Sequence, residues 1–152
     1  MISFVVATHG TFSDGLLNAA ELIMGKIENI KTLNLLHGDD IEKFHLSILD
    51  AIHSVNQNNE GIIIFTDLAG ASPYNQATLA IQHIDDPLKH NIYVVSGVNL
   101  PLLIEAVNHQ YLGTNIHDVA NDLTNIEKIG IDSWHISKLK EFTEEDSEDD
   151  FW

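Results

Sequence analysis

Two short segments of the chain carry residues that can do chemistry, and each follows a run of apolar residues. The first is THG, residues 8–10, and the second is TDLAGASPYN, residues 66–75. A carboxylate that accepts a hydrogen bond from Nδ1–H of an imidazole fixes the tautomer of the ring and leaves a lone pair on Nε2. If the two segments lie side by side, Asp67 orients His9 as a nucleophile. A packing histidine, a metal ligand and a phosphate binder are the other roles open to His9 at this point.

The second segment is suited to bind an anion. Its Gly70, Ala71 and Ser72 offer backbone N–H groups and a hydroxyl where a helix is expected to begin, and a helix N-terminus favours negative charge. We expect Gly10, directly after the histidine, to belong to the same phosphate-binding group. All seven basic residues of the chain are lysines, so a phosphate site here must work without the bidentate guanidinium group of arginine.

The other eight histidines lie in ordinary helix, turn or tail contexts, and we interpret them as structural. They are His37, His45, His53, His83, His90, His109, His117 and His135. No second histidine stands at the spacing of a metal site from His9, and the chain has no cysteine. The sequence therefore predicts no metal site and no cofactor.

Length and charge exclude several classes of protein. A chain of 152 residues with 44% hydrophobic residues suits one domain. No apolar run reaches the ~20 residues of a membrane span, and the N-terminus does not resemble a signal peptide. With 7 basic against 23 acidic residues the net charge is −16, which excludes the basic surface of a nucleic-acid-binding protein. A cytoplasmic protein is the expected class.

Apolar stretches typical of buried strands alternate with segments of helical periodicity. The predicted strands are residues 2–8, 30–36, 61–67 and 91–97, and the predicted helices are residues 12–25, 39–57, 72–84, 100–109 and 116–126. Ser13 or Asp14 is the expected N-cap of the first helix and Ser72 that of the third. These alternating units predict an α/β fold: an open, doubly wound sheet of four parallel strands with helices on both faces. The strand order that we expect is 2-1-3-4, in which the first and third strands are neighbours. In such sheets ligands bind beyond the carboxyl ends of the strands, where His9 and Asp67 are expected.

The C-terminal part of the chain does not follow this pattern. The segment GIDSWHIS, residues 130–137, is a poor strand candidate without a local partner. Residues 138–152 form an acidic tail that we expect to be disordered. The predicted domain therefore covers residues 1–137.

Four motifs follow one another along the chain. They are ATHG at 7–10, AAELIMG at 19–25, FTDLAGASPYNQA at 65–77 and VSGVNLPLL at 95–103. In this order they resemble the IIA domain of the mannose family of the sugar phosphotransferase system. The resemblance runs from residue 2 to about residue 127, and Ala71 stands where many members of the family have glycine.

The resemblance implies a phosphocarrier. His9 falls on the family's phosphorylated histidine, Asp67 on the carboxylate that orients it, and Ser72 on the serine of the loop that holds the phosphoryl group. In that family the donor is the phosphorylated carrier protein HPr, and the acceptor is a histidine of the IIB component, which serves the membrane components IIC and IID. The implied location is the cytoplasm, with contact to the membrane only through the transporter complex. Members also form homodimers in which a C-terminal strand joins the partner's sheet, and residues 130–137 are the candidate strand here.

Other hypotheses remain beside this one. An IIA-like subunit that passes phosphate to a dihydroxyacetone kinase is disfavoured, because its histidine loop would have serine on both sides of the histidine. A regulatory module with a phosphorylated histidine would belong to a longer chain, and a flavodoxin-like ligand-binding domain would use His9 only structurally. The membrane components select the sugar, so mannose, fructose, sorbose, amino sugars, gluconate and uronic-acid disaccharides are all candidates.

Overall fold

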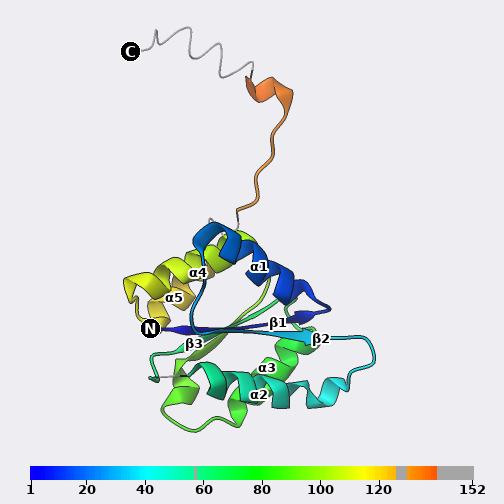
Figure 1. Ribbon diagram of the computed structural model, residues 1–152, viewed down its shortest axis with the longest axis vertical. Helices are drawn as coiled ribbons and strands as arrows, with labels where there is room; N and C mark the ends of the chain where they lie inside the picture. Colours follow the sequence, from blue (N-terminus) through cyan, green and yellow to red (C-terminus); the bar gives the residue numbers. More distant parts are fainter. Residues whose placement is uncertain (57, 126–129, 140–152) are drawn as a thin grey trace.

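The centre of the molecule is a four-stranded parallel sheet, visible edge-on in Figure 1. The computed structural model describes residues 1–56, 58–125 and 130–139. The strands are β1 (Ser3–His9), β2 (Ile30–Leu35), β3 (Ile62–Thr66) and β4 (Ile92–Val95). Their order is β2-β1-β3-β4, and every pair is parallel, which confirms the predicted sheet.

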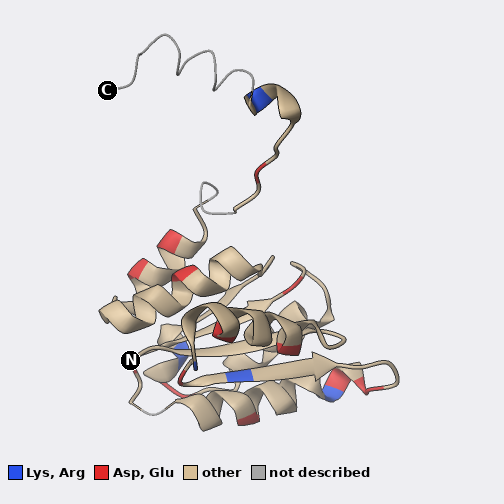
Figure 2. Cartoon of the chain, turned by 45° about the horizontal axis from the view of Figure 1, so that its top comes forward, with Lys and Arg blue, Asp and Glu red and all other residues tan. Residues whose placement is uncertain are grey.

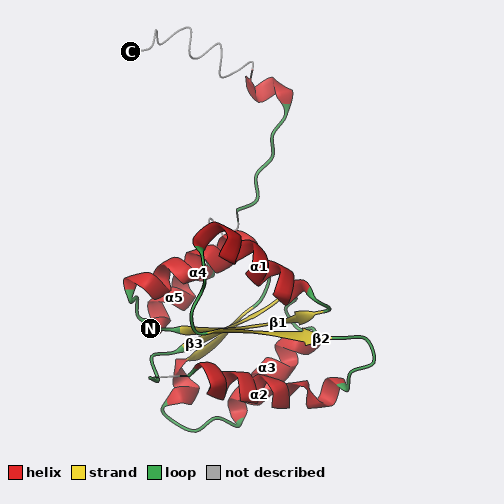
Figure 3. Cartoon of the chain, viewed as in Figure 1, coloured by secondary structure: helices red, strands yellow, loops and turns green. Residues whose placement is uncertain are grey.

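Helices cover both faces of the sheet, as Figure 3 shows. The helices on one face are α1 (Phe12–Met24), α4 (Leu100–Leu112) and α5 (Ile116–Leu123), and those on the other are α2 (Phe44–Val55) and α3 (Ser72–Gln82). Two short 3₁₀ helices, η1 (Ile41–Lys43) and η2 (Leu88–Asn91), precede α2 and β4. The winding direction reverses between β1 and β3, so the switch point of this sheet, where ligands bind in doubly wound folds, lies at the carboxyl ends of these two strands.

The alternation of side chains along β1 decides where its last residue points. Phe4 and Val6 pack into the core beneath α1, α4 and α5, whereas Val5 and Ala7 pack into the core beneath α2 and α3. Because neighbouring side chains of a strand point to opposite faces, His9 leaves the strand on the side of α2 and α3. Burial on both faces explains why the strand reads as a continuous apolar run.

The start of α1 differs from the prediction. The helix begins at Phe12 with Thr11 as N-cap, and Thr11 makes no side-chain capping hydrogen bond. Ser13 lies inside the first turn, and its N–H donates to Oγ1 of Thr8 at 2.8 Å. A hydroxyl from the end of β1 thus satisfies one free N–H group of α1, a task that the sequence pattern assigned to Ser13 or Asp14.

The start of the second predicted helix also differs. Residues 41–43 form η1, in which the Asp40 side chain accepts a hydrogen bond from the Glu42 N–H, and α2 begins only at Phe44. Ile41 is consequently 45% exposed, whereas Phe44 is buried. A 3₁₀ turn has three residues per turn, so it places Ile41 off the apolar face that α2 continues.

The segment predicted as a C-terminal strand forms no strand in the single chain. Residues 130–135 have no regular secondary structure and residues 136–139 are helical. Gly130 crosses the start of α4, since a Cβ at this position would lie 2.7 Å from Cγ of Pro101. From there residues 131–139 run away from the folded body (Figure 1). Strand exchange in a dimer stays a prediction.

Two features of the prediction extend past the described residues. The last residue of the predicted helix 116–126 and residues 140–152 of the predicted acidic tail lie outside them. Among the helices that the structure describes, none has the length and apolarity needed to cross a bilayer.

Candidate functional site

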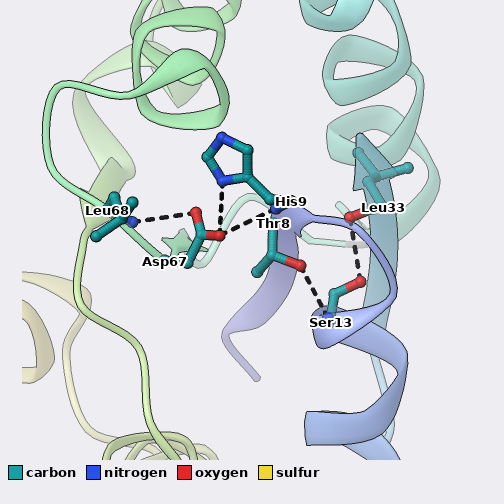
Figure 4. A network of polar contacts seen from close by, with 6 residues as sticks. All are labelled: Thr8, His9, Ser13, Leu33, Asp67 and Leu68. Atoms are coloured by element: carbon teal, nitrogen blue, oxygen red, sulfur yellow. Dashed lines mark hydrogen bonds and ion pairs between the residues drawn. The ribbon is translucent and has the colours of Figure 1, made fainter. Parts of the chain in front are cut away.

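His9 and Asp67 meet at the switch point of the sheet. The Oδ2 atom of Asp67 lies 2.8 Å from Nδ1 of the His9 ring and also accepts the His9 backbone N–H at 3.0 Å. The side chain of His9 is 47% exposed and that of Asp67 is 16% exposed. Figure 4 shows the second ring nitrogen of His9 directed away from the carboxylate. One carboxylate oxygen therefore holds both the backbone and the ring of His9.

This contact determines the tautomer of the ring. The pKa of Asp67 lies below its ordinary value: burial alone would raise it, but the hydrogen bonds from the His9 ring and the His9 N–H outweigh burial. An ionised carboxylate only accepts hydrogen bonds, so Nδ1 of His9 must carry the proton. In the neutral ring the lone pair is then on Nε2, the nitrogen that faces away from the carboxylate.

The turn after His9 is fixed by backbone contacts rather than left open. Gly10 has a φ of +58°, in the left-handed region that favours glycine. Its N–H donates to the Leu35 carbonyl at the end of β2, at 2.9 Å. The N–H of Gly10 is thus committed to the sheet, and its contribution to a phosphate site is the shape of the turn.

The loop between β3 and α3 begins with Asp67 and lies beside the histidine (Figure 4). Asp67 uses its second oxygen, Oδ1, to accept the Leu68 N–H at 3.0 Å. Gly70 follows with a φ of +75°, and its carbonyl accepts a hydrogen bond from the Asn75 side chain at 2.9 Å. Asn75 was not predicted as a site residue, although an amide one turn into the helix is a suitable group to hold the preceding loop.

The predicted role of Ser72 as N-cap is wrong. The N-cap of α3 is Ala71, which makes no side-chain capping bond, and Ser72 is the first residue of the helix. Its N–H belongs to the first turn, where N–H groups have no partner within the helix. The Ala71 N–H makes a long contact of 3.4 Å to the Leu68 carbonyl. The N-terminus of α3 therefore keeps N–H groups that can bind an anion.

A second polar network fixes the opposite flank of the site and was not predicted. Ser13 donates to the Leu33 carbonyl at 3.1 Å and contacts the Asn34 side chain. Asp14 accepts hydrogen bonds from Asn34 and Thr32, both at 2.7 Å. These bonds, that from Asn34 first, lower the pKa of Asp14. The network joins the first turn of α1 to β2 and so holds the loop that carries His9.

Two large cavities formed by the described residues lie away from His9. A cavity of about 510 Å³ lies near the N-terminal residue and the start of α5, and another of about 440 Å³ lies beside β4; neither is lined by His9 or Asp67. Figure 2 shows the lysines of the described residues scattered over separate elements. The side chain of His9 is half exposed, so a histidine on a macromolecular partner can reach it.

The family of the chain follows from its sequence once this site is described. The family model "PTS system fructose IIA component", where PTS stands for phosphotransferase system, matches residues 3–124. The chain belongs to this family. The matched range extends from the first residue of β1 to the residue after α5, and it includes both His9 and Asp67.

Individual relatives agree with this assignment. The chain is 29% identical over 110 residues to the mannose-specific EIIAB component of the PTS of Escherichia coli (strain K12), covering 70% of this chain and 31% of that protein. It is 27% identical over 112 residues to the sorbose-specific EIIA component of the PTS of Klebsiella pneumoniae, covering 73% and 76%. This chain thus spans about a third of the length of the mannose-specific relative.

Solved structures agree as well. A phosphotransferase system component EIIA from Streptococcus agalactiae superposes with a TM-score of 0.73 and 28% identity, over 88% of this chain and 97% of that one. A mannose/sorbose-specific IIA subunit from Enterococcus faecalis gives the same TM-score at 20% identity, over 88% and 94%, and so shares the fold. The chain is therefore a IIA component in fold and in family.

Proposed function

We propose that the chain is a phosphocarrier of the phosphotransferase system. His9 accepts a phosphoryl group from phosphorylated HPr and passes it to a histidine of a IIB component during sugar uptake. The observation that supports this role is the hydrogen bond of 2.8 Å between Nδ1 of His9 and Asp67, with Nε2 directed away from it. The role belongs to the cytoplasm, and the membrane components IIC and IID are reached only through IIB.

The transfer itself requires orientation more than covalent assistance. The Nε2 lone pair attacks the phosphorus atom of the donor's phosphohistidine, and the new Nε2–P bond forms as the donor's N–P bond breaks in line with it. Positive charge develops on the His9 ring in this step. The carboxylate of Asp67, held at Nδ1, stabilises that charge and keeps the proton on Nδ1.

The phosphoryl group in the product would be held by the N-terminus of α3. Its oxygens carry negative charge, and the free N–H groups and the Ser72 hydroxyl are donors at a helix terminus. The two flanking turns contain glycine or alanine at Gly10, Gly70 and Ala71, so no large side chain keeps their backbone away from the phosphoryl group. Together with His9 and Asp67 they form the proposed site.

Partner docking would supply what the free protein lacks, which is protection from water. Three large apolar side chains in the segments next to the site are exposed: Phe12 (46%), Leu36 (47%) and Leu68 (60%). Apolar contact with a partner would exclude water from the phosphohistidine, which hydrolyses readily. The net charge of −16 favours partners with basic docking faces.

Phosphorylation with purified components tests this proposal. The chain is incubated with radiolabelled phosphoenolpyruvate, enzyme I and HPr, and the protein-bound label is tested for stability in acid and alkali. We expect an alkali-stable, acid-labile label on the wild type and on His37→Ala, a control in the exposed loop after β2, and no label on His9→Ala. An unlabelled wild type would refute the phosphocarrier function, and a labelled His9→Ala would refute the site.

We further propose that the protein is a homodimer in which residues 130–137 join the partner's sheet. Within the described residues β4 pairs only with β3, so its outer edge is free. The cavity of about 440 Å³ lies along this edge and includes Val94 and Val95. The C-terminal segment exposes Ile131 (86%) and Trp134 (68%), which is unfavourable for a segment without a partner.

Light scattering of the full chain tests the dimer. We expect the mass of two chains for the wild type and of one chain for Trp134→Ser combined with Ile131→Ser. Leu22→Ser is the control, because Leu22 is equally exposed, at 88%, but lies on α1. A monomeric wild type, or a double variant that remains dimeric, would refute the exchange without touching the phosphocarrier proposal.

A further inference from the structure

A cluster of three potential metal ligands lies on the face of the sheet opposite α2 and α3. Glu105 and His109 are one turn apart on α4, and Asp122 comes from the last turn of α5. Nε2 of His109 lies 2.8 Å from Oδ2 of Asp122 and 3.6 Å from Oε1 of Glu105. One ligand atom from each of the three residues lies within 4.8 Å of the other two. The cluster is separate from His9 and has no part in the proposed phosphoryl transfer.

A fourth residue orients the imidazole from outside the cluster. Nδ1 of His109 lies 3.0 Å from Oγ1 of Thr114, which follows α4. The side chain of His109 is only 15% exposed, so packing and this bond together fix the ring. Histidines that bind metals typically donate their second ring N–H to a neighbouring oxygen, which leaves the other nitrogen free for the metal. Without a bound metal the Asp122 carboxylate accepts a hydrogen bond from Nε2–H, so the Thr114 hydroxyl donates to Nδ1. With a metal on Nε2 the ring proton would lie on Nδ1, and Thr114 would accept the hydrogen bond from it.

We propose that Glu105, His109 and Asp122 bind a divalent transition-metal ion of the zinc class. One imidazole and two carboxylates are ligands that zinc accepts, with bonds of about 2.0–2.2 Å and a water molecule in the fourth position. Tetrahedral bonds of this length separate ligand atoms by roughly 3.4 Å. The separation of 3.6 Å to Glu105 already fits, and the contact of 2.8 Å to Asp122 must widen by about half an ångström.

The chemistry of the ligands selects this class of metal. Magnesium and calcium take six or more oxygen ligands, whereas the cluster has a central nitrogen and two carboxylates. Two ionised carboxylates and a neutral imidazole would balance a divalent cation. Glu105 and Asp122 also interact with other groups, so the metal must compete with those contacts. A bound ion would join α4 to α5 and stabilise this layer.

Zinc competition with a chromophoric chelator, using the full chain and zinc alone, measures the binding. We expect one zinc per chain at this site in the wild type and at least about tenfold weaker binding in His109→Gln. Glu105→Gln and Asp122→Asn should each weaken it as well. Thr114→Val, which removes only the orienting hydroxyl, should raise the dissociation constant about tenfold.

His90→Gln is the matched control. His90 follows Asp86 by four residues, as His109 follows Glu105, and its Nε2 lies 2.9 Å from Oδ1 of Asp86. The pair of His90 and Asp86 is, however, highly exposed. We expect His90→Gln and His9→Ala to bind zinc like the wild type. Circular dichroism melts without metal show that each variant is folded, and added zinc should raise the melting temperature of the wild type but not that of His109→Gln.

Three results would overturn the proposal. They are a zinc affinity in His109→Gln equal to that of the wild type, an equal loss in His90→Gln, or a wild type whose dissociation constant exceeds about 0.1 mM. The proposal departs from the expectation, drawn from the sequence, that His109 is only structural. It does not depend on the phosphocarrier function, since its readout is metal binding alone.

Discussion

Asp67→Asn is the substitution that most directly tests how the site works. Both contacts of Asp67 to His9 use a single oxygen, Oδ2, while Oδ1 accepts the Leu68 N–H. An asparagine with its oxygen toward His9 would keep the tautomer, but its amide N–H₂ would then oppose the Leu68 N–H. The reverse orientation would place N–H₂ against both donors of His9. Either orientation loses the charge and at least one hydrogen bond.

The expected loss follows from these contacts. A hydrogen bond to an ionised group contributes about 1.5–3 kcal/mol and a neutral one about 0.5–1.5 kcal/mol. Replacing the charged acceptor of a developing imidazolium therefore costs about 1–2 kcal/mol in the transition state, or a roughly fivefold to thirtyfold slower transfer. The rate falls further if the asparagine takes the reverse orientation, because the nucleophilic lone pair then moves to the wrong nitrogen.

Single-turnover transfer from phosphorylated HPr, followed by rapid quenching, measures this rate. Asp40→Asn is the matched control for charge, because the Asp40 carboxylate also accepts a backbone N–H, that of Glu42, but does so at the start of η1 instead of at the histidine. Nitrogen chemical shifts of the His9 ring report its tautomer. Transfer by Asp67→Asn within about twofold of the wild-type rate would refute the reasoning, and an equal loss in Asp40→Asn would attribute the effect to net charge.

Four further predictions concern stability and the phosphate site. Thr66 has a fully buried hydroxyl that finds no hydrogen-bond partner among the described residues. Urea unfolding of Thr66→Val should therefore show unchanged or higher stability, and a loss above about 1 kcal/mol would contradict this. Gly61→Ala should lower the free energy of unfolding by about 1–3 kcal/mol, because φ is +119° and a Cβ would lie 2.6 Å from Ile116. Ser72→Ala should change stability by less than about 0.5 kcal/mol but slow phosphoryl transfer, because Ser72 is no N-cap. The pKa of Asp67 is lower in the folded protein than the ordinary aspartate pKa of about 3.9. The ionised carboxylate therefore stabilises the fold above pH ~3.9, and this stabilisation is lost as the pH falls through the pKa of the folded state. Between neutral and acidic pH, the urea midpoint of Asp67→Asn should consequently fall less than that of the wild type.

The sheet could be predicted because its strands are buried on both faces. The five residues of β3 are all buried, and the first four of them are apolar. Right-handed crossovers and helices on both faces restrict the strand order without determining it, so the order 2-1-3-4 was an expectation, which the pairing of β1 with β3 confirms. This expected order is why His9 and Asp67 could be placed together before any coordinates were known.

The helix starts and the cluster of proposed metal ligands depend on contacts between residues of different elements, which local sequence patterns do not show. The N–H of Ser13 is satisfied by Thr8, which lies before the turn, so local capping patterns point to the wrong residue. Asp122 joins His109 only because α5 packs against α4. The spacing of Glu105 and His109, one helical turn apart, was the single part of that cluster visible in the sequence.

A difference of one residue at the end of β3 has a consequence for the chemistry. The sequence predicts a strand through Asp67, but the strand ends at Thr66, which pairs with Ala7 of β1. Along β3 the even-numbered residues face α2 and α3, the side on which His9 leaves β1. Had the strand continued, alternation would direct Asp67 to the opposite face, away from the imidazole. The chain must therefore leave the sheet after Thr66, so that the carboxylate can turn toward β1 and bind both the ring and the N–H of His9.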